Sequence, residues 1–335
     1  MMNNLPEATM TLILTRQHLE QVLTMRDCIE AIADVMRRFS LGETVMPVRL
    51  MTPVPGRGSH AAMPAAIPGL GVLGIKSITI FPTNPERGAP AILGLVILNE
   101  SNTGRPLAVM DAAYLTAVRT AAASAVATRA LARPDASALA LIGAGVQAGS
   151  HLWALSEVRP LRSVAVYDID RLVAERFIET KSRRHPELTF RLAASPEDAI
   201  RGADLVCTVT TSQTPVVDLN WLKEGVHINA VGAHTPEARE LDSATVTAAR
   251  VLVDSREAAL KEAGDLIIPL QEGRFGAEHI RDEIGEVLAG IKPGRTSDAQ
   301  ITVYKSVGIA VQDIAAARLA YERAVSLGVG VPVEL

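Results

Sequence analysis

Aromatic residues are scarce in this sequence. Phenylalanine, tyrosine and tryptophan make up 3% of the chain, although hydrophobic residues make up 48%. The core must therefore be built from alanine, valine, leucine and isoleucine, as in parallel sheets covered by alanine-rich helices. With 335 residues, the chain is long enough for two domains.

Cysteine is scarce too, since only Cys28 and Cys207 occur, far apart in the chain. This excludes a disulfide framework and indicates a reducing cytoplasm. Neither the cysteines nor the seven histidines show metal-ligand spacing, so we expect no metal site. The net charge of −4 gives no electrostatic basis for binding nucleic acid or a membrane surface. We also expect no signal peptide and no membrane span, because the apolar stretches are short or interrupted by glycine and proline.

Two kinds of periodicity divide the chain. In the first part, helical patterns over 15–41 and 115–132 enclose strand-like runs punctuated by proline and glycine. From residue 137, short apolar strands alternate with helical patterns, which is typical of a doubly wound parallel sheet. The strands expected are Val45–Met51, Gly74–Phe81, Ala91–Leu98 and Arg105–Met110 in the first part, and 138–142, 163–168, 188–192, 205–209, 227–231 and 251–253 in the second.

The sequence therefore predicts an α/β protein, with a Rossmann-type doubly wound parallel sheet and an α+β substrate domain. We place the first domain at 1–133 and the Rossmann domain at 134–297. The apolar segment 298–335, with a helical pattern over 311–327, is expected to return and complete the first domain.

A glycine-rich turn opens the second domain. The strand 138–142 leads into Gly143-x-Gly145-x-x-Ala148, and a helical pattern follows directly. Such a unit presents backbone N–H groups and a helix N-terminus to a pyrophosphate, although a structural tight turn is the alternative. We expect cofactor contacts from Gly143, Gly145, Val146, Gln147 and Ala148.

Asp168 ends the next expected strand, 25 positions after Gly143. A carboxylate there accepts hydrogen bonds from ribose hydroxyls and repels a 2′-phosphate, so NAD is favoured over NADP. Two alternatives stay open, since Asp168 could cap the next helix and the nearby Arg171 could hold the phosphate of NADP. Thr208 and Thr210, at the end of another strand, either line the nucleotide crevice or cap a turn.

Three basic residues of the first domain lie in unusually apolar sequence surroundings. Arg49 and Lys76 lie inside apolar runs, and Arg119 lies near the start of an alanine-rich helix. A buried charge without a partner is costly, so an anion is expected to compensate them. The alternative for each is a surface position on an amphipathic strand or helix.

Together these segments resemble the ornithine cyclodeaminase/mu-crystallin family over nearly the whole chain. The individual motifs are short, but their order and spacing are specific. They are Met63-Pro64, Gly74-Ile-Lys76, Pro82-x-Asn84-x-x-Arg87-Gly88, Thr103-Gly-x-Pro106, Leu115-Thr-x-x-Arg-Thr-Ala-Ala122, Gly143-Ala-Gly145, Gly232 with Arg239-Glu-Leu-Asp242, and Ser306-Val-Gly308 with Gln312-Asp313.

The resemblance implies a substrate and dimerisation domain beside an NAD(P)-binding domain, hence a homodimer. It also implies that Arg49, Lys76 and Arg119 clamp the carboxylate of an amino or imino acid, and we add Thr120 to the expected cofactor contacts. A lysine between two arginines should have a lowered pKa, which would let Lys76 act in proton transfer near neutral pH.

Three departures from the family pattern argue against ornithine as the substrate. His234 stands where the cyclodeaminases carry an acidic residue, Ala61 replaces a glutamate and Ala91 replaces a threonine. The distal ammonium of ornithine would lack an anionic partner. His234 is instead a second candidate proton donor, with a plain loop residue as the alternative.

The leading hypothesis is an NAD(P)-dependent oxidoreductase that transfers a hydride between nicotinamide and the Cα of a small α-imino or amino acid. Its substrate would be a cyclic ketimine, such as Δ1-pyrroline-2-carboxylate or Δ1-piperideine-2-carboxylate, or the imine of an alanine dehydrogenase-like reaction. A cyclodeaminase with its acid supplied by Glu237 or Asp313 is the second hypothesis. A mu-crystallin-like protein that binds a nucleotide without turnover is the third.

Overall fold

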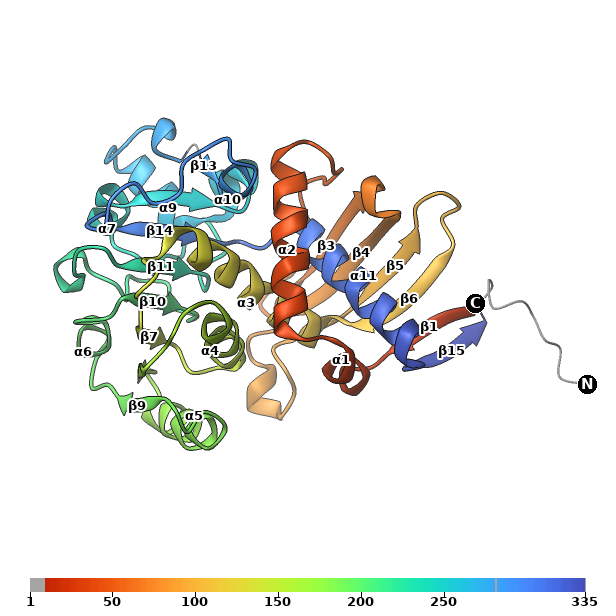
Figure 1. The fold of residues 1–335 in the computed structure, drawn as a ribbon, viewed down its shortest axis with the longest axis horizontal. Coiled ribbons are helices and arrows are strands. Elements are labelled where there is room, and N and C mark those ends of the chain that lie inside the picture. Colours follow the sequence, from red (N-terminus) through yellow and green to blue (C-terminus); the bar gives the residue numbers. More distant parts are fainter. Residues whose placement is uncertain (1–9, 281, 335) are drawn as a thin grey trace, which may run out of the picture. The chain divides into compact units, whose positions relative to one another are not determined.

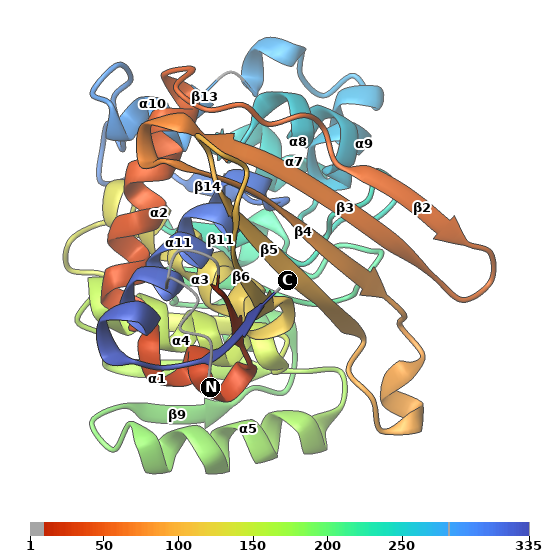
Figure 2. The same ribbon diagram turned by 90° about the vertical axis from the view of Figure 1, so that its right-hand side faces the viewer.

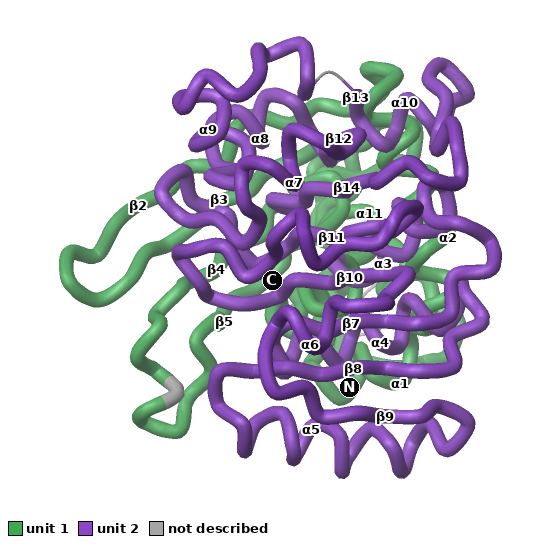
Figure 3. The backbone as a smooth tube through the Cα atoms, turned by 90° about the vertical axis from the view of Figure 1, so that its left-hand side faces the viewer, with its two compact units in different colours: residues 1–119, 309–335 green, residues 120–308 purple. Residues whose placement is uncertain are grey.

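The computed structural model describes residues 10–280 and 282–334 and confirms the predicted α/β fold class. The chain divides into two compact units, residues 1–119 with 309–335 and residues 120–308 (Figure 3). Within the described ranges, no helix is long and apolar enough to cross a membrane.

Unit 1 is built on a seven-stranded mixed sheet in the order β15-β1-β6-β5-β4-β3-β2. Its strands are β1 (Met10–Leu14), β2 (Leu50–Val54), β3 (Gly58–Ile67), β4 (Val72–Ile80), β5 (Ile92–Glu100), β6 (Pro106–Asp111) and β15 (Val331–Glu334). Strands β2 to β6 form an antiparallel run, whereas β1 pairs with β6 in parallel. The C-terminal strand β15 thus closes one edge of the sheet.

Three helices of unit 1 pack together, namely α1 (Arg16–Val22), α2 (Met25–Ser40) and α11 (Ala310–Leu327). Helix α11 lies along one face of β3, β4 and β5 and also contacts α2 (Figure 1). Alternate residues of β3 are buried on that face, which is the period of a half-covered strand. Among the described residues of unit 1, no helix covers the other face of β2 to β5, which is turned to the viewer in Figure 2.

Unit 2 contains an eight-stranded parallel sheet in the order β13-β12-β14-β11-β10-β7-β8-β9 (Figure 3). Its strands are β7 (Ala138–Ile142), β8 (Ser163–Tyr167), β9 (Thr189–Leu192), β10 (Leu205–Thr208), β11 (His227–Ala230), β12 (Arg250–Val253), β13 (Asp282–Glu283) and β14 (Thr302–Lys305). The chain runs outward from β7 to β9 and then returns to add β10 on the other side of β7. Such a reversal is where open α/β sheets bind ligands.

The helices of unit 2 connect these parallel strands. They are α4 (Val146–Val158), α5 (Arg171–Arg184), α6 (Pro196–Ile200), α7 (Ser243–Ala248), α8 (Arg256–Glu262), α9 (Gly264–Gln271) and α10 (Ile284–Leu288). Helix α3 (Ala112–Leu131) begins in unit 1 and ends in unit 2.

Several expected boundaries differ from the structure. The strand expected over Val45–Met51 is wrong, because only Val45 forms an isolated bridge and β2 starts at Leu50. The helix expected over 15–41 is two helices, since the Thr24 side chain accepts a hydrogen bond from the Asp27 N–H and starts α2 anew. The long strand β3 escaped the sequence analysis.

The domain limits expected from the sequence, 133 and 298, also differ from the limits of the two compact units, which fall after residues 119 and 308. The reason at the second limit is β14, which pairs in parallel with β11 and β12 and therefore belongs to the sheet of unit 2. Only the segment from residue 309 onward returns to unit 1.

Gly74 allows α11 to lie close to β4. A Cβ at this position would lie 2.3 Å from the carbonyl oxygen of Ile97 and 2.9 Å from the Cδ1 atom of Ile314. We expect Gly74→Ala to lower the free energy of unfolding by about 1–3 kcal/mol, the usual cost of overpacking a core.

Urea unfolding followed by circular dichroism measures this cost. Gly145→Ala is the comparison variant, because a Cβ there meets no atom within 4 Å, and it should lower the unfolding midpoint less than Gly74→Ala does. Equal midpoints for Gly74→Ala and the wild type would contradict the close packing.

Candidate functional site

Two buried cations share one carboxylate in unit 1. Lys76 on β4 is 1% exposed, and its Nζ lies 2.8 Å from the Asp313 carboxylate on α11. The Nε of Arg119 donates to the same carboxylate at 2.8 Å, and Asp313 itself is 0% exposed. The anion that the sequence analysis expected for these cations is therefore, in part, supplied by the chain.

Charge in this cluster is out of balance, because two cations face one carboxylate. Burial, followed by repulsion from Arg119, lowers the pKa of Lys76 to about 7. Asp313 raises this pKa and Arg49 lowers it further. The lowered pKa agrees with the sequence analysis, but burial rather than the arginines is its largest cause. A ligand carboxylate would neutralise the excess positive charge.

Arg119 keeps donors available for such a ligand. Its Nη1 donates to the Gln312 side chain at 2.8 Å, and Gln312 is buried and approaches the sulfur of Met36. Among the described residues, no hydrogen-bond partner faces Nη2 of Arg119. Arg49, half-buried immediately before β2, acts electrostatically on Lys76.

The glycine turn of unit 2 leaves the backbone open at the start of α4. Gly143 has a φ of 97°, and a Cβ there would lie 2.9 Å from the carbonyl oxygen of Val209. Gly145 is the N-cap of α4 and provides no side chain to cap the first N–H groups. A Cβ on Gly145 would enter open space, so the backbone is accessible to a bound anion. Val146 and Gln147 begin α4, and the small buried Ala148 packs in its first turn.

Asp168 lies beside this turn. Its carboxylate accepts hydrogen bonds from the Ala144 N–H at 2.8 Å and from the Asp170 N–H at 2.9 Å. The alternative that Asp168 caps the next helix is wrong, because the N-cap of α5 is Asp170. Arg171 is exposed and forms an ion pair with Glu175 at 2.8 Å.

The hydroxyls of Thr208 and Thr210 both donate to the carboxylate of Glu240, at 2.8 Å and 2.7 Å. Thr208 is fully buried, so its hydroxyl faces the protein interior. His234 lies on an exposed loop after β11, with its Nδ1 3.0 Å from the carbonyl oxygen of Gly232. Thr120 is 6% exposed in α3.

The sequence analysis missed the buried cluster around Glu240. Its carboxylate also accepts from the Gly232 N–H at 2.7 Å, while Asp265 and Lys305 pair behind it at 2.8 Å. The sequence held a signal for this cluster. Lys305 lies in an apolar strand just as Lys76 does, so its burial beside an anion could have been predicted. In the sequence, Glu240 is marked only by the motif Arg239-Glu-Leu-Asp242.

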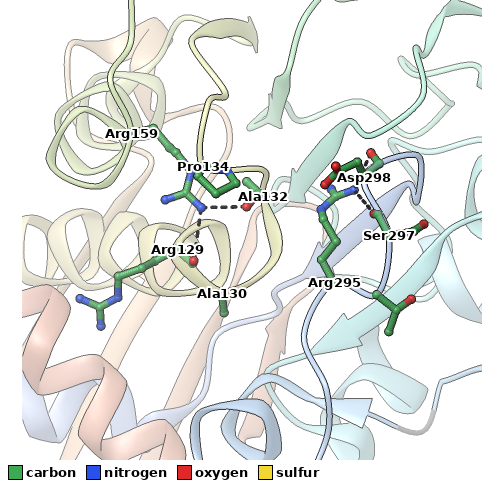
Figure 4. Close-up of a pocket in the computed structure, with 9 residues that line it drawn as sticks. Arg129, Ala130, Ala132, Pro134, Arg159, Arg295, Ser297 and Asp298 are labelled. Carbon is green, nitrogen blue, oxygen red and sulfur yellow. Dashed lines mark hydrogen bonds between the residues drawn. The ribbon is translucent and has the colours of Figure 1, made fainter.

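Unit 2 also contains a cavity lined by arginine side chains. A cavity of about 530 Å³ is lined by Arg129, Arg159 and Arg295, among others, near the ends of α3 and α4 (Figure 4). Arg159 donates to the carbonyls of Thr128 and Ala132, and Arg295 donates to that of Leu131. These guanidinium groups cap carbonyls at the C-terminus of α3, so the cavity is not the candidate site.

Removing the negative charge of Asp313 should lower the pKa of Lys76 below about 7, because Asp313 favours the ammonium form. We expect the Lys76 midpoint to move to lower pH in Asp313→Asn. NMR titration of carbon-labelled lysine, assigned with Lys76→Arg, measures it. Asp34→Asn on α2 is the control, because Asp34 pairs with Arg37 and Arg38. An unmoved or raised midpoint in Asp313→Asn would be the contrary result.

Known proteins resemble this chain in sequence and in fold. The chain is 38% identical over 320 residues to alanine dehydrogenase of Archaeoglobus fulgidus, covering 96% of this chain and 97% of that protein. It is 39% identical over 325 residues to Delta(1)-pyrroline-2-carboxylate reductase of Bacillus cereus, covering 96% and 99%. The structure of the Thermococcus litoralis Delta(1)-pyrroline-2-carboxylate reductase in complex with NADH and L-proline matches with a TM-score of 0.94 and 40% identity, covering 96% and 100%.

The sequence profile of one family matches residues 9–328. This match and the full-length relatives confirm the family that the motifs resembled, and the relatives agree with a reductase-like member rather than an ornithine cyclodeaminase. The chain belongs to the ornithine cyclodeaminase/mu-crystallin family.

Proposed function

We propose that this protein is an NAD-dependent oxidoreductase that transfers a hydride between nicotinamide and the Cα of a small α-imino or amino acid. The observation that carries the proposal is the buried cluster of Lys76, Arg119 and Asp313, whose positive charge exceeds its negative charge. Relatives named for imine reduction and alanine dehydrogenation support it.

The carboxylate of the substrate neutralises this excess charge. Arg119 offers its Nη2 donors, and Arg49, whose charge acts on Lys76, adds a second planar guanidinium for the carboxylate. Asp313 keeps the Lys76 ammonium and the Arg119 fork in place before the substrate binds. Preorganised charges of this kind cost little reorganisation during the reaction.

Lys76 supplies the proton that imine reduction requires. A pKa of about 7 leaves its ammonium form populated near neutral pH while making that form a ready donor. Bound NADH supplies the hydride. As the Cα–H bond forms, the imine nitrogen gains a proton from Lys76, and the product is an amine. We also propose His234 as a second proton donor.

The cofactor residues favour NAD. Asp168, fixed beside the glycine turn by the Ala144 N–H, presents a carboxylate where a ribose 2′-OH binds and a 2′-phosphate would be repelled. Arg171 is committed to Glu175, which weakens the case for NADP. The neighbouring side chains Val146 and Ile169 are 78% and 94% exposed, which leaves apolar surface beside the turn for an adenosine.

A reductase fits the substrate side better than a cyclodeaminase does. Ala61 is buried on the same face of β3 as Met63, and Met63 pairs with Lys76 across the sheet. A methyl group thus replaces a carboxylate near Lys76, where a diamino acid would need an anion. The structure gives Asp313 to Lys76 and Arg119, so it is not a spare acid for this purpose.

The decisive experiment is NADH oxidation, followed by absorbance, with Δ1-pyrroline-2-carboxylate, Δ1-piperideine-2-carboxylate, or pyruvate with ammonia. We expect turnover with at least one of them, and a rate that falls as pH rises through about 7, the pKa of Lys76. Lys76→Met should lower kcat about 100-fold or more.

Lys76→Arg is the matched control, since it keeps the charge but donates no proton near neutral pH. The KM of Lys76→Arg should stay close to the wild-type value, while its kcat should fall. A flat trace with all three substrates would reject the proposal. Ammonia release from diamino acids would then favour a cyclodeaminase, and nucleotide binding without either activity would favour a binding protein.

We also propose a homodimer that forms through the uncovered face of the unit 1 sheet. Leu93, Leu95 and Ile97 alternate along β5 and are 44%, 50% and 36% exposed, and Leu50 on β2 is 66% exposed. Apolar patches of this kind mark protein interaction sites. The reducing cytoplasm is the proposed location, because Cys28 and Cys207 are both buried free thiols.

Leu95→Lys should therefore convert the dimer to a monomer in analytical ultracentrifugation, because it places a charge in the proposed interface. Leu172→Lys on α5, at a side chain 57% exposed, is the matched control and should stay dimeric. A dimer that persists in Leu95→Lys would place the interface elsewhere.

A further inference from the structure

Glu240 joins two loops at the carboxyl edge of the parallel sheet. Its Oε1 accepts hydrogen bonds from the backbone N–H and the hydroxyl of Thr210, after β10. Its Oε2 accepts from the Thr208 hydroxyl and from the N–H groups of Gly232 and Ala233, after β11. Five donors converge on a side chain that is 0% exposed, an arrangement suited to an ionised carboxylate.

The charge of this cluster does not cancel. Asp265 is also 0% exposed and accepts from the backbone N–H groups of Glu240 and Leu241 at 2.7 Å and 2.8 Å. Lys305 pairs with Asp265 at 2.8 Å and donates to the Ala233 carbonyl. Two buried carboxylates thus face one buried ammonium. Burial and Asp265 raise the pKa of Glu240, whereas Lys305 and the Thr210 hydrogen bonds oppose that rise.

In the proposed function, these loops would form one half of the nucleotide crevice. The glycine turn after β7 and Asp168 after β8 belong to the half that takes the adenosine and pyrophosphate. The ends of β10 and β11, on the other side of β7, belong to the half that takes the nicotinamide. Gly232 brings Glu240 close to this edge, since a Cβ there would lie 2.4 Å from its Oε1.

We infer that the buried excess of negative charge at Glu240, Asp265 and Lys305 sets the relative affinity for the two forms of the cofactor. The nicotinamide ring is a cation in NAD+ and neutral in NADH, so a nearby negative charge stabilises NAD+ selectively. Hydride transfer from a bound NADH to the Cα of the imine would leave the positive charge on the ring, and the imine nitrogen would take up a proton. Among the enzyme-bound species, the cluster therefore favours the complex of NAD+ with the amine over the complex of NADH with the imine.

The inference rests on the proposed function, because it requires a bound nicotinamide. The readout is the ratio of two dissociation constants, Kd for NAD+ over Kd for NADH, measured by calorimetry and by NADH fluorescence. We expect Glu240→Gln to raise this ratio about 3- to 10-fold, the effect of one unit charge acting across a partly polar protein interior. A purely structural role would change both constants by the same factor.

Asp265→Asn provides a second variant. It removes a negative charge from the same cluster while leaving every hydrogen bond of the Glu240 carboxylate in place, and the ratio should rise again. Asp204→Asn is the matched control. Asp204 is 8% exposed and accepts from the Ser137 and Ala138 N–H groups at the opposite ends of the strands, so its loss should leave the ratio unchanged.

A ratio that is unchanged or lower in the folded cluster variants would overturn the inference while leaving the proposed function intact. If Glu240→Gln fails to fold, the ratio of the two dissociation constants in Asp265→Asn alone tests the inference. A wild-type protein that binds neither NAD+ nor NADH would overturn the proposed function itself, and this inference with it.

Discussion

The candidate substrate site depends on the negative charge of Asp313. Its carboxylate has to satisfy Lys76 and Arg119 in an environment without solvent, so it must lie within hydrogen-bond distance of both. That requirement fixes α11 against β4 and explains why the C-terminal segment completes unit 1. It also leaves one positive charge over, which adds to burial in lowering the pKa of Lys76 and which a ligand carboxylate would neutralise.

Unit 2 also buries an unbalanced charge, but here the excess is negative. Glu240 and Asp265 are buried beside a single cation, Lys305, and much of their charge is satisfied by backbone N–H groups. In both units the buried ions contribute little stability by themselves, because desolvation offsets their attraction. What these ions provide is a buried charge that no other group of the cluster neutralises. One unit offers positive charge suited to a carboxylate, and the other offers negative charge suited to an oxidised nicotinamide.

The sequence predicts the features that depend on neighbours along the chain. The strand, glycine turn and helix around Gly143 are contiguous, and Asp168 follows at a spacing fixed by one βαβ unit. The apolar surroundings of Lys76 predict its burial, because a charge in such a strand has nowhere polar to lie. Both predictions use rules that act over about thirty residues or fewer.

Features that depend on distant partners could not be predicted in this way. Lys76 and Asp313 are 237 positions apart, and only the fold brings them together. The Glu240 cluster depends on close approach at Gly232, which composition does not reveal. β14 was assigned to the wrong unit, because a buried central strand and a strand returning to another sheet have the same apolar pattern. The roles of Arg49, Thr120 and His234 stay predictions.

The central claim is that excess positive charge around Asp313 holds the carboxylate of an amino or imino acid. Calorimetric titration of the NAD+-loaded protein with L-proline and L-alanine, each compared with its carboxamide, tests it most directly. The acids should bind at least about 10-fold more tightly than the amides, because a charge-assisted bond to arginine is lost with the negative charge. Equal affinity of acid and amide would contradict the claim.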